Sequence, residues 1–163
     1  IHELVNAGHK LKCMLSFAFG DEYSNQLKKK TQDLGIVNNI LWLGYLSYED
    51  MSKHYNAADI VVSVPSSDSS PKSVYEAMFC QKPIIVSDLQ WSYELLDDKC
   101  IARVSARDSK QLTATINKII TNIEYAQNLA DNALLTAHKY FDYKKNMIKM
   151  ESLMIMEVNE KIE

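Results

Sequence analysis

The sequence predicts an α/β domain in which helices cover both faces of a parallel sheet. Short runs rich in Ile, Val and Leu alternate with longer segments whose apolar residues recur at helical spacing. The run Ile84-Ile85-Val86 is wholly apolar, as expected for a strand that is buried on both faces. At 163 residues, 47% of them hydrophobic, the chain is long enough for one sizeable core. We therefore expect a single domain over residues 1–163.

In the first half of the chain, strands are expected at 11–19, 40–43 and 59–64. Apolar spacing places the tail of a helix at 1–5 and further helices at 21–34 and 48–57. Gly35 stands where a helix C-terminal cap belongs, and Ser47 with Asp50 resembles a capping box. The abrupt start within or just before a helix predicts a fragment, truncated at its N-terminus, to which a preceding strand belongs.

In the second half, we expect strands at 84–86 and 101–104 and helices at 71–80, 91–96 and 124–140. A longer helix is expected to begin after Asp108, and a last helix begins at Asp142. Asp108 with Gln111 is predicted to cap the helix that follows residue 108. Several methionines recur along the last helix. We interpret these methionines as packing residues, with a partner-binding stripe as the alternative. The apolar residues of this helix are Met147, Met150, Leu153, Met154 and Val158.

Composition excludes several classes of function. A net charge of −3 with dispersed Lys and Arg argues against nucleic acid as the main partner. Every apolar run is shorter than the roughly 20 residues of a membrane span. The cysteines Cys13, Cys80 and Cys100 are far apart in apolar segments, which favours buried free thiols in a reducing cytoplasm. The four histidines lack metal-ligand spacing, so no metal site is predicted.

Residues 65–88 contain the candidate site. A strand ends near Val64, a Ser-rich loop follows, and Pro71 is expected at the first position of a helix with Ser70 as its cap. This strand–loop–helix turn is where α/β sheets bind ligands. The first amides of the helix have no intrahelical acceptor and can donate to a phosphate. They belong to Lys72, Ser73 and Val74.

Two carboxylates flank these amides. Asp68 lies in the loop that approaches the helix, and Glu76 shares a helix face with Ser73. Carboxylates can accept hydrogen bonds from the hydroxyls of a sugar while the amides hold a phosphate. The alternative is a capped surface helix with two solvated acids, and spacing alone does not decide between the two.

The same residues resemble a known family. Asp68-x7-Glu76 followed by Ala77-Met78-Phe79-Cys80-Gln81-Lys82-Pro83-Ile84-Ile85 is similar to the Glu-x7-Glu motif of retaining, group 1 (family 4) glycosyltransferases of the GT-B fold. Residues 39–47 and 55–62 resemble the preceding blocks of that family. The resemblance implies a Rossmann-like three-layer α/β/α domain, the C-terminal nucleotide-sugar-binding half of a GT-B enzyme.

The resemblance also implies roles for individual residues. Glu76 matches the Glu that holds the ribose hydroxyls of the donor, and Asp68 matches the catalytic-site Glu against the transferred sugar. Backbone amides of the 69–72 loop (Ser69, Ser70, Lys72) would contact the sugar, those of Ser73 and Val74 the pyrophosphate, and the turn at Tyr45 and Leu46 the base. The donor would be a UDP-, GDP- or ADP-sugar, transferred with retained configuration and without a metal or other cofactor.

At the level of the whole protein, the resemblance implies a hexosyltransferase-type parent enzyme. It would act on a glycan or lipid-linked acceptor bound by an N-terminal domain that this chain lacks. The fragment alone is then expected to be inactive. The expected location is the cytoplasm, with peripheral association at the inner face of the membrane as an open alternative. Nucleic acid and a transmembrane segment are not expected.

The chain departs from the family pattern in three places. Asp68 is one methylene shorter than the usual Glu. The loop reads Ser-Ser-Pro where Gly is frequent, and Gln81 stands where Gly is usual. The family's Arg and Lys phosphate clamp would precede Ile1. The alternatives are therefore a degenerate, non-catalytic nucleotide-binding relative and a flavodoxin-like interaction module, whereas a dehydrogenase is disfavoured because no G-x-G-x-x-G is present.

Overall fold

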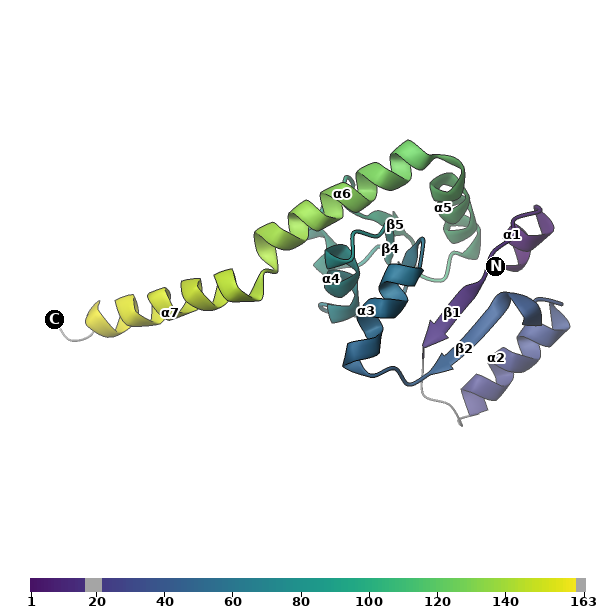
Figure 1. Ribbon diagram of the computed structural model, residues 1–163, viewed down its shortest axis with the longest axis horizontal. Helices are drawn as coiled ribbons and strands as arrows, with labels where there is room; N and C mark the ends of the chain where they lie inside the picture. The colour runs from purple at the N-terminus through teal and green to yellow at the C-terminus, as the bar shows by residue number, and fades with distance from the viewer. Residues whose placement is uncertain (17–21, 161–163) are drawn as a thin grey trace.

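The computed structural model describes residues 1–16 and 22–160, with side chains up to residue 156, so the ends of two expected elements at 17–19 and 21 lie outside the described residues. Helices and strands alternate along the chain (Figure 1). In order they are α1 His2–Asn6, β1 Cys13–Ser16, α2 Glu22–Asp33, the 3₁₀ turn η1 Val37–Asn39, β2 Ile40–Gly44, α3 Tyr48–Ala57, β3 Val61–Ser63, α4 Lys72–Phe79, β4 Ile84–Ser87, the 3₁₀ turn η2 Gln90–Tyr93, β5 Ala102–Val104, α5 Ser109–Thr121, α6 Ile123–Tyr140 and α7 Tyr143–Glu160.

All strand pairs are parallel, which confirms the predicted α/β class. β1 pairs with β2, with Cys13 opposite Ile40. β4 is the middle strand of a second group, between β3 and β5, with Val61 opposite Ile84 and Ile85 opposite Ala102. The predicted single sheet therefore differs from the observed arrangement. Hydrogen bonds within residues 1–16 and 22–160 join the strands as two sheets, because no described strand pairs with both β1 and β3.

The core explains why the layers form around β4. Ile84 and Val86 belong to one apolar cluster, whereas Ile85 between them belongs to another. Because successive side chains of a strand point to opposite faces, β4 is covered on both sides. All three side chains are fully buried. Burial of each stabilises the fold by about 1.5–3 kcal/mol, which anchors the strand whose neighbours carry the candidate site.

Short-range sequence signals set three of the helix ends as predicted, namely the starts of α3 and α5 and the end of α2. The Asp50 amide donates to Ser47 Oγ at 3.2 Å, and the Ser47 hydroxyl donates to Asp50 Oδ2 at 2.8 Å. At the start of α5, the Gln111 amide donates to Asp108 Oδ1 at 2.9 Å. Gly35, just after α2, has a φ of 66° in the left-handed region, as a C-terminal cap requires.

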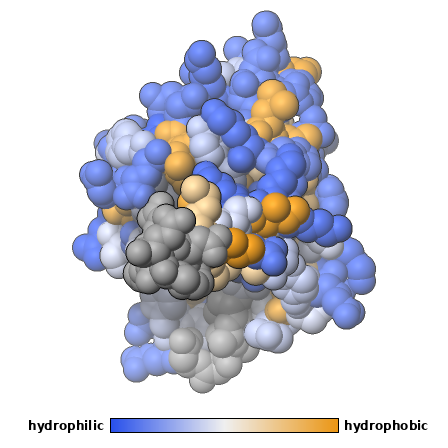
Figure 2. All heavy atoms as spheres, turned by 90° about the vertical axis from the view of Figure 1, so that its left-hand side faces the viewer, coloured by the Kyte–Doolittle hydropathy of each residue, from blue (hydrophilic) through white to orange (hydrophobic). Residues whose placement is uncertain are grey.

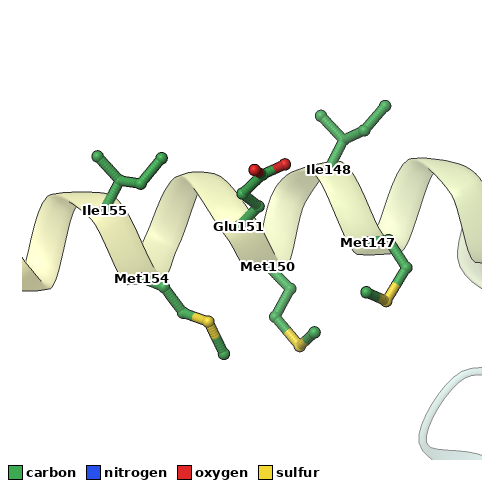
Figure 3. A pocket seen from close by; sticks show the side chains of 6 residues that line it. All are labelled: Met147, Ile148, Met150, Glu151, Met154 and Ile155. Atoms are coloured by element: carbon green, nitrogen blue, oxygen red, sulfur yellow. The ribbon is translucent and has the colours of Figure 1, made fainter.

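The structure corrects the predicted packing of α7. This helix extends away from the body of the molecule (Figure 1), and its methionines are exposed rather than buried. Met147, Met150 and Met154 project from one side, and Ile148 and Ile155 from the other (Figure 3). The hollow beside them is lined by residues of α7 alone, so it is the open flank of a helix and not an enclosed site. Val158 lies beyond the described side chains.

The view toward the free end of α7 is mainly hydrophilic, with hydrophobic side chains in separate spots (Figure 2). Within the described residues, no helix combines the length and apolar character that crossing a membrane would require.

Candidate functional site

The candidate site is built on the N-terminus of α4, which follows β3 through the loop at 64–71. The start of this loop is anchored to the sheet, because the buried Ser87 hydroxyl of β4 donates to the carbonyl of Pro65 at 2.6 Å. The carboxyl end of β3 and the first turn of α4 therefore lie at the edge where parallel α/β sheets bind ligands.

The helix begins one residue later than predicted. Pro71 is the N-cap residue, with a ψ of 110°, instead of the first helical residue. Ser70 was expected to cap the helix, but its Oγ lies 3.0 Å from the Tyr75 hydroxyl and no side chain caps α4. The Val74 amide donates to the Pro71 carbonyl at 3.0 Å. The amides of Lys72 and Ser73 are thus the outermost donors of the helix, whereas the Val74 amide, which was also predicted to be open, already has an acceptor.

Asp68 turns back onto its own loop. Its Oδ1 accepts hydrogen bonds from the amides of Ser69 at 2.7 Å and Ser70 at 3.1 Å. Short Asp side chains commonly hold the backbone of a turn in this way. In this structure, the two amides expected to face a sugar are therefore occupied by Asp68, and all three residues are exposed.

Glu76 occupies the half-buried flank of the site. Its side chain is 26% exposed, and its Oε1 lies 3.6 Å from the Lys72 ammonium one turn earlier. The Lys72 side chain is 78% exposed, so this ion pair contributes little to stability and can rearrange. A carboxylate that is partly shielded but open on one side is suited to accept hydrogen bonds from ligand hydroxyls.

The structure brings the turn at 44–47 to the same site. Lys72 Nζ lies over the ring of Tyr48, 5.1 Å from its centroid, and Tyr48 is the first residue of α3. Tyr45, in the turn just before α3, is 88% exposed, and Leu46 is half-buried. The contact between Lys72 and Tyr48 thus joins the start of α3, which directly follows the predicted base-contacting turn, to the predicted phosphate-contacting helix.

Sequence reasoning missed Tyr55, which also contacts Glu76. Tyr55 lies on α3, is 9% exposed, and donates from its hydroxyl to Glu76 Oε2 at 3.4 Å. Burial, together with the negative charge of Glu76, raises the pKa of Tyr55 to about 12. The available signal was a tyrosine on the buried face of a predicted helix, because a buried phenol needs a polar partner.

The segment after β4 forms the neighbouring rim of the sheet. Arg103 of β5, 9% exposed, donates to the Leu96 carbonyl at 2.9 Å and to Ser92 Oγ at 3.0 Å, and its guanidinium also bonds the Ser92 carbonyl and Asp98. Trp91 of η2 packs edge-on against Tyr75 of α4. Arg103 therefore fixes the backbone that supports α4 from this side.

The three cysteines lie outside this constellation. Cys100 is buried, Cys13 and Cys80 are half-buried, and all are free thiols, as predicted. Burial raises the pKa of each thiol, which keeps it protonated and unreactive near neutral pH. Among the described residues, no three His, Cys, Asp or Glu side chains are grouped to bind one metal ion.

Comparisons with known proteins identify the family of this chain. Residues 3–135 match the family model described as glycosyl transferases group 1. A curated relative, alpha-monoglucosyldiacylglycerol synthase of Streptococcus pneumoniae, is 26% identical over 88 residues, which are 54% of this chain and 20% of that protein.

Solved structures share the fold. HepE of Anabaena in complex with UDP superposes with a TM-score of 0.80 at 24% identity, over 88% of this chain and 41% of that one. The C-terminal domain of the group 1 protein LpcC of Francisella tularensis gives a TM-score of 0.68 at 19% identity, over 75% of this chain and 64% of that one. This chain spans only about two-fifths of HepE and one-fifth of the curated relative.

Proposed function

This chain belongs to the group 1 glycosyl transferases, and we propose that it is the C-terminal, donor-binding part of such an enzyme. The observation that carries the proposal is the arrangement around Glu76. The open amides of α4, the half-buried carboxylate one turn later and the start of α3, which directly follows the 44–47 turn, lie beside one another. An anion site beside a hydroxyl-accepting carboxylate fits the diphosphate and ribose of a nucleotide-sugar.

In this proposal, the amides of Lys72 and Ser73 bind the diphosphate and Glu76 accepts hydrogen bonds from the ribose hydroxyls. Val74 shapes the first turn from beneath, because its side chain is buried and its amide already has an acceptor. The backbone at Tyr45 and Leu46 contacts the base. Lys72 moves from Glu76 toward the phosphates when the donor binds.

Asp68 is proposed as the catalytic carboxylate against the transferred sugar. For Ser69 and Ser70 to donate to the sugar, the Asp68 side chain must release their amides. Donor binding therefore includes a local rearrangement of this exposed loop. Stabilisation of the sugar and the leaving diphosphate by amides and hydroxyl contacts requires no metal ion, consistent with the proposed absence of a metal cofactor.

The parent protein is proposed to transfer a hexose from a UDP-, GDP- or ADP-sugar to a glycan or lipid-linked acceptor, with retained configuration. HepE was solved with UDP and with UDP-glucose, and the curated relative is named for a glucosyl lipid, which supports UDP as the first nucleotide to test. We propose that the acceptor is bound by a separate N-terminal domain of the parent protein.

Calorimetric titration with UDP, GDP and ADP tests the proposal. We expect one nucleotide to bind, and Glu76→Ala to weaken it by about 1.5–3 kcal/mol, or about 10- to 100-fold, because a charge-assisted hydrogen bond to ribose is lost. Glu151→Ala on α7 is the matched control and should leave affinity unchanged. Absence of binding by all three nucleotides at millimolar concentration would overturn the proposal. Binding without transfer by the parent enzyme would identify a degenerate, binding-only relative.

A further inference from the structure

The two oxygens of the Glu76 carboxylate have different surroundings. Oε2 faces the body of the protein, where it accepts from the Tyr55 hydroxyl at 3.4 Å. Oε1 lies 3.6 Å from the exposed ammonium of Lys72. Oε1 is therefore the oxygen on the side of the exposed Lys72 ammonium, whereas Oε2 is held by a neighbour from another helix.

Tyr55 is fixed independently of any ligand. Its side chain belongs to the apolar cluster that also contains Val74 and Met78 of α4, so the ring holds α3 and α4 together. A buried aromatic ring loses little further freedom when its hydroxyl makes a hydrogen bond, because only two side-chain torsions need to be set. The phenol is thus a rigid donor at a defined position beside Glu76.

The roles of donor and acceptor in this hydrogen bond are also defined. A pKa of about 12 keeps the Tyr55 phenol protonated at every physiological pH, so its hydroxyl donates to the Glu76 carboxylate. At 3.4 Å the contact is longer than the 2.5–3.0 Å of a strong O–H···O bond, and a small shift of Glu76 toward Tyr55 shortens it.

We infer that Tyr55 is a positioning residue that holds Glu76 through Oε2 and directs Oε1 to the ribose hydroxyls of the donor nucleotide. The inference rests on the proposed donor-binding function and deepens it. Tyr55 does not touch the ligand. Tyr55 therefore affects selectivity. A carboxylate held in one orientation increases the affinity for a ligand that has hydroxyls and leaves the affinity for a ligand without them unchanged.

The test compares Tyr55→Phe with the unaltered chain. Phenylalanine keeps the ring in the core and removes only the hydroxyl. Affinities are measured by calorimetry for the tightest of UDP, GDP and ADP and for its 2′,3′-dideoxy analogue. We expect the unaltered chain to prefer the ribonucleotide by about 10- to 100-fold, and Tyr55→Phe to reduce that preference by about 3- to 10-fold. Affinity for the dideoxy analogue should be the same in both proteins.

The control is Tyr23→Phe, the same change at an exposed tyrosine of α2, which should leave the preference unaltered. A merely structural role of Tyr55 would weaken both nucleotides equally and leave their ratio constant, and that result would overturn the inference. If the unaltered chain itself fails to prefer the ribonucleotide, the proposed role of Glu76 fails first. The two failures are therefore distinguishable.

Discussion

Replacing Arg103 by methionine should destabilise the domain, because Arg103 holds the backbone of the segment that follows β4. Arg103 is 9% exposed and donates to the Leu96 carbonyl, to both oxygens of Ser92 and to Asp98, while its guanidinium lies 4.3 Å from the centre of the Tyr93 ring. Asp98 is 87% exposed, so that ion pair contributes at most about 1 kcal/mol. The bonds to Ser92 and Leu96 dominate, since their buried oxygens lose a charged donor.

Because each such bond contributes about 1.5–3 kcal/mol and the contributions are not additive, we expect Arg103→Met to lower the free energy of unfolding by about 3 kcal/mol. The corresponding fall in Tm is about 6–12 °C for a domain of this size. Urea unfolding followed by circular dichroism measures the change, and Arg103→Lys should recover about half of it, since one ammonium reaches fewer of the acceptors. Lys99→Met is the exposed control. If Arg103→Met lowered the free energy of unfolding by less than about 0.5 kcal/mol, as is typical of surface changes, the Arg103 hydrogen bonds would not stabilise the domain as described.

Three further changes test local features by the same unfolding measurement. Ser47→Ala removes the N-cap of α3 and should cost about 1 kcal/mol, and no loss would contradict the observed cap. Gln81 has a φ of 54°, so Gln81→Gly should be more stable than Gln81→Ala by about 1 kcal/mol, and the reverse order would exclude backbone strain there. The pKa of Tyr55, raised from about 10 to about 12, favours the protonated phenol in the folded state. Its contribution is complete below pH 10 and is lost as pH rises to 12, so the unaltered chain should lose up to about 2–3 kcal/mol across that range relative to Tyr55→Phe. If the free energy of unfolding changed equally with pH in the two proteins, the raised pKa of Tyr55 would be contradicted.

The helices and strands could be predicted because their signals are local. Asp108 and Ser47 cap helices through atoms three residues away, and Gly35 ends α2 through its own backbone angles. The wholly apolar run of β4 required cover on both faces. The position of Gln81 also has a local explanation, since its backbone adopts the left-handed conformation that glycine favours.

The details of the site could not be predicted, because they depend on contacts between distant segments or on competing local bonds. The pairing of Tyr55 with Glu76 joins α3 to α4 across 21 residues of sequence. The spacing of Asp68 placed its carboxylate near the helix but could not show that its own loop amides would occupy it. The apolar spacing of α7 indicated a helix, yet spacing alone does not determine what covers an apolar side chain.

We propose that the N-terminus of α4 and Glu76 form the donor site. Amide chemical shifts of the ¹⁵N-labelled chain, followed during titration with the tightest of UDP, GDP and ADP, locate the bound nucleotide. We expect the largest changes at Lys72 and Ser73, with changes also at Tyr45 and Leu46 and none along α7. Saturable changes centred on α5 and α6, with the first turn of α4 unaffected, would contradict it.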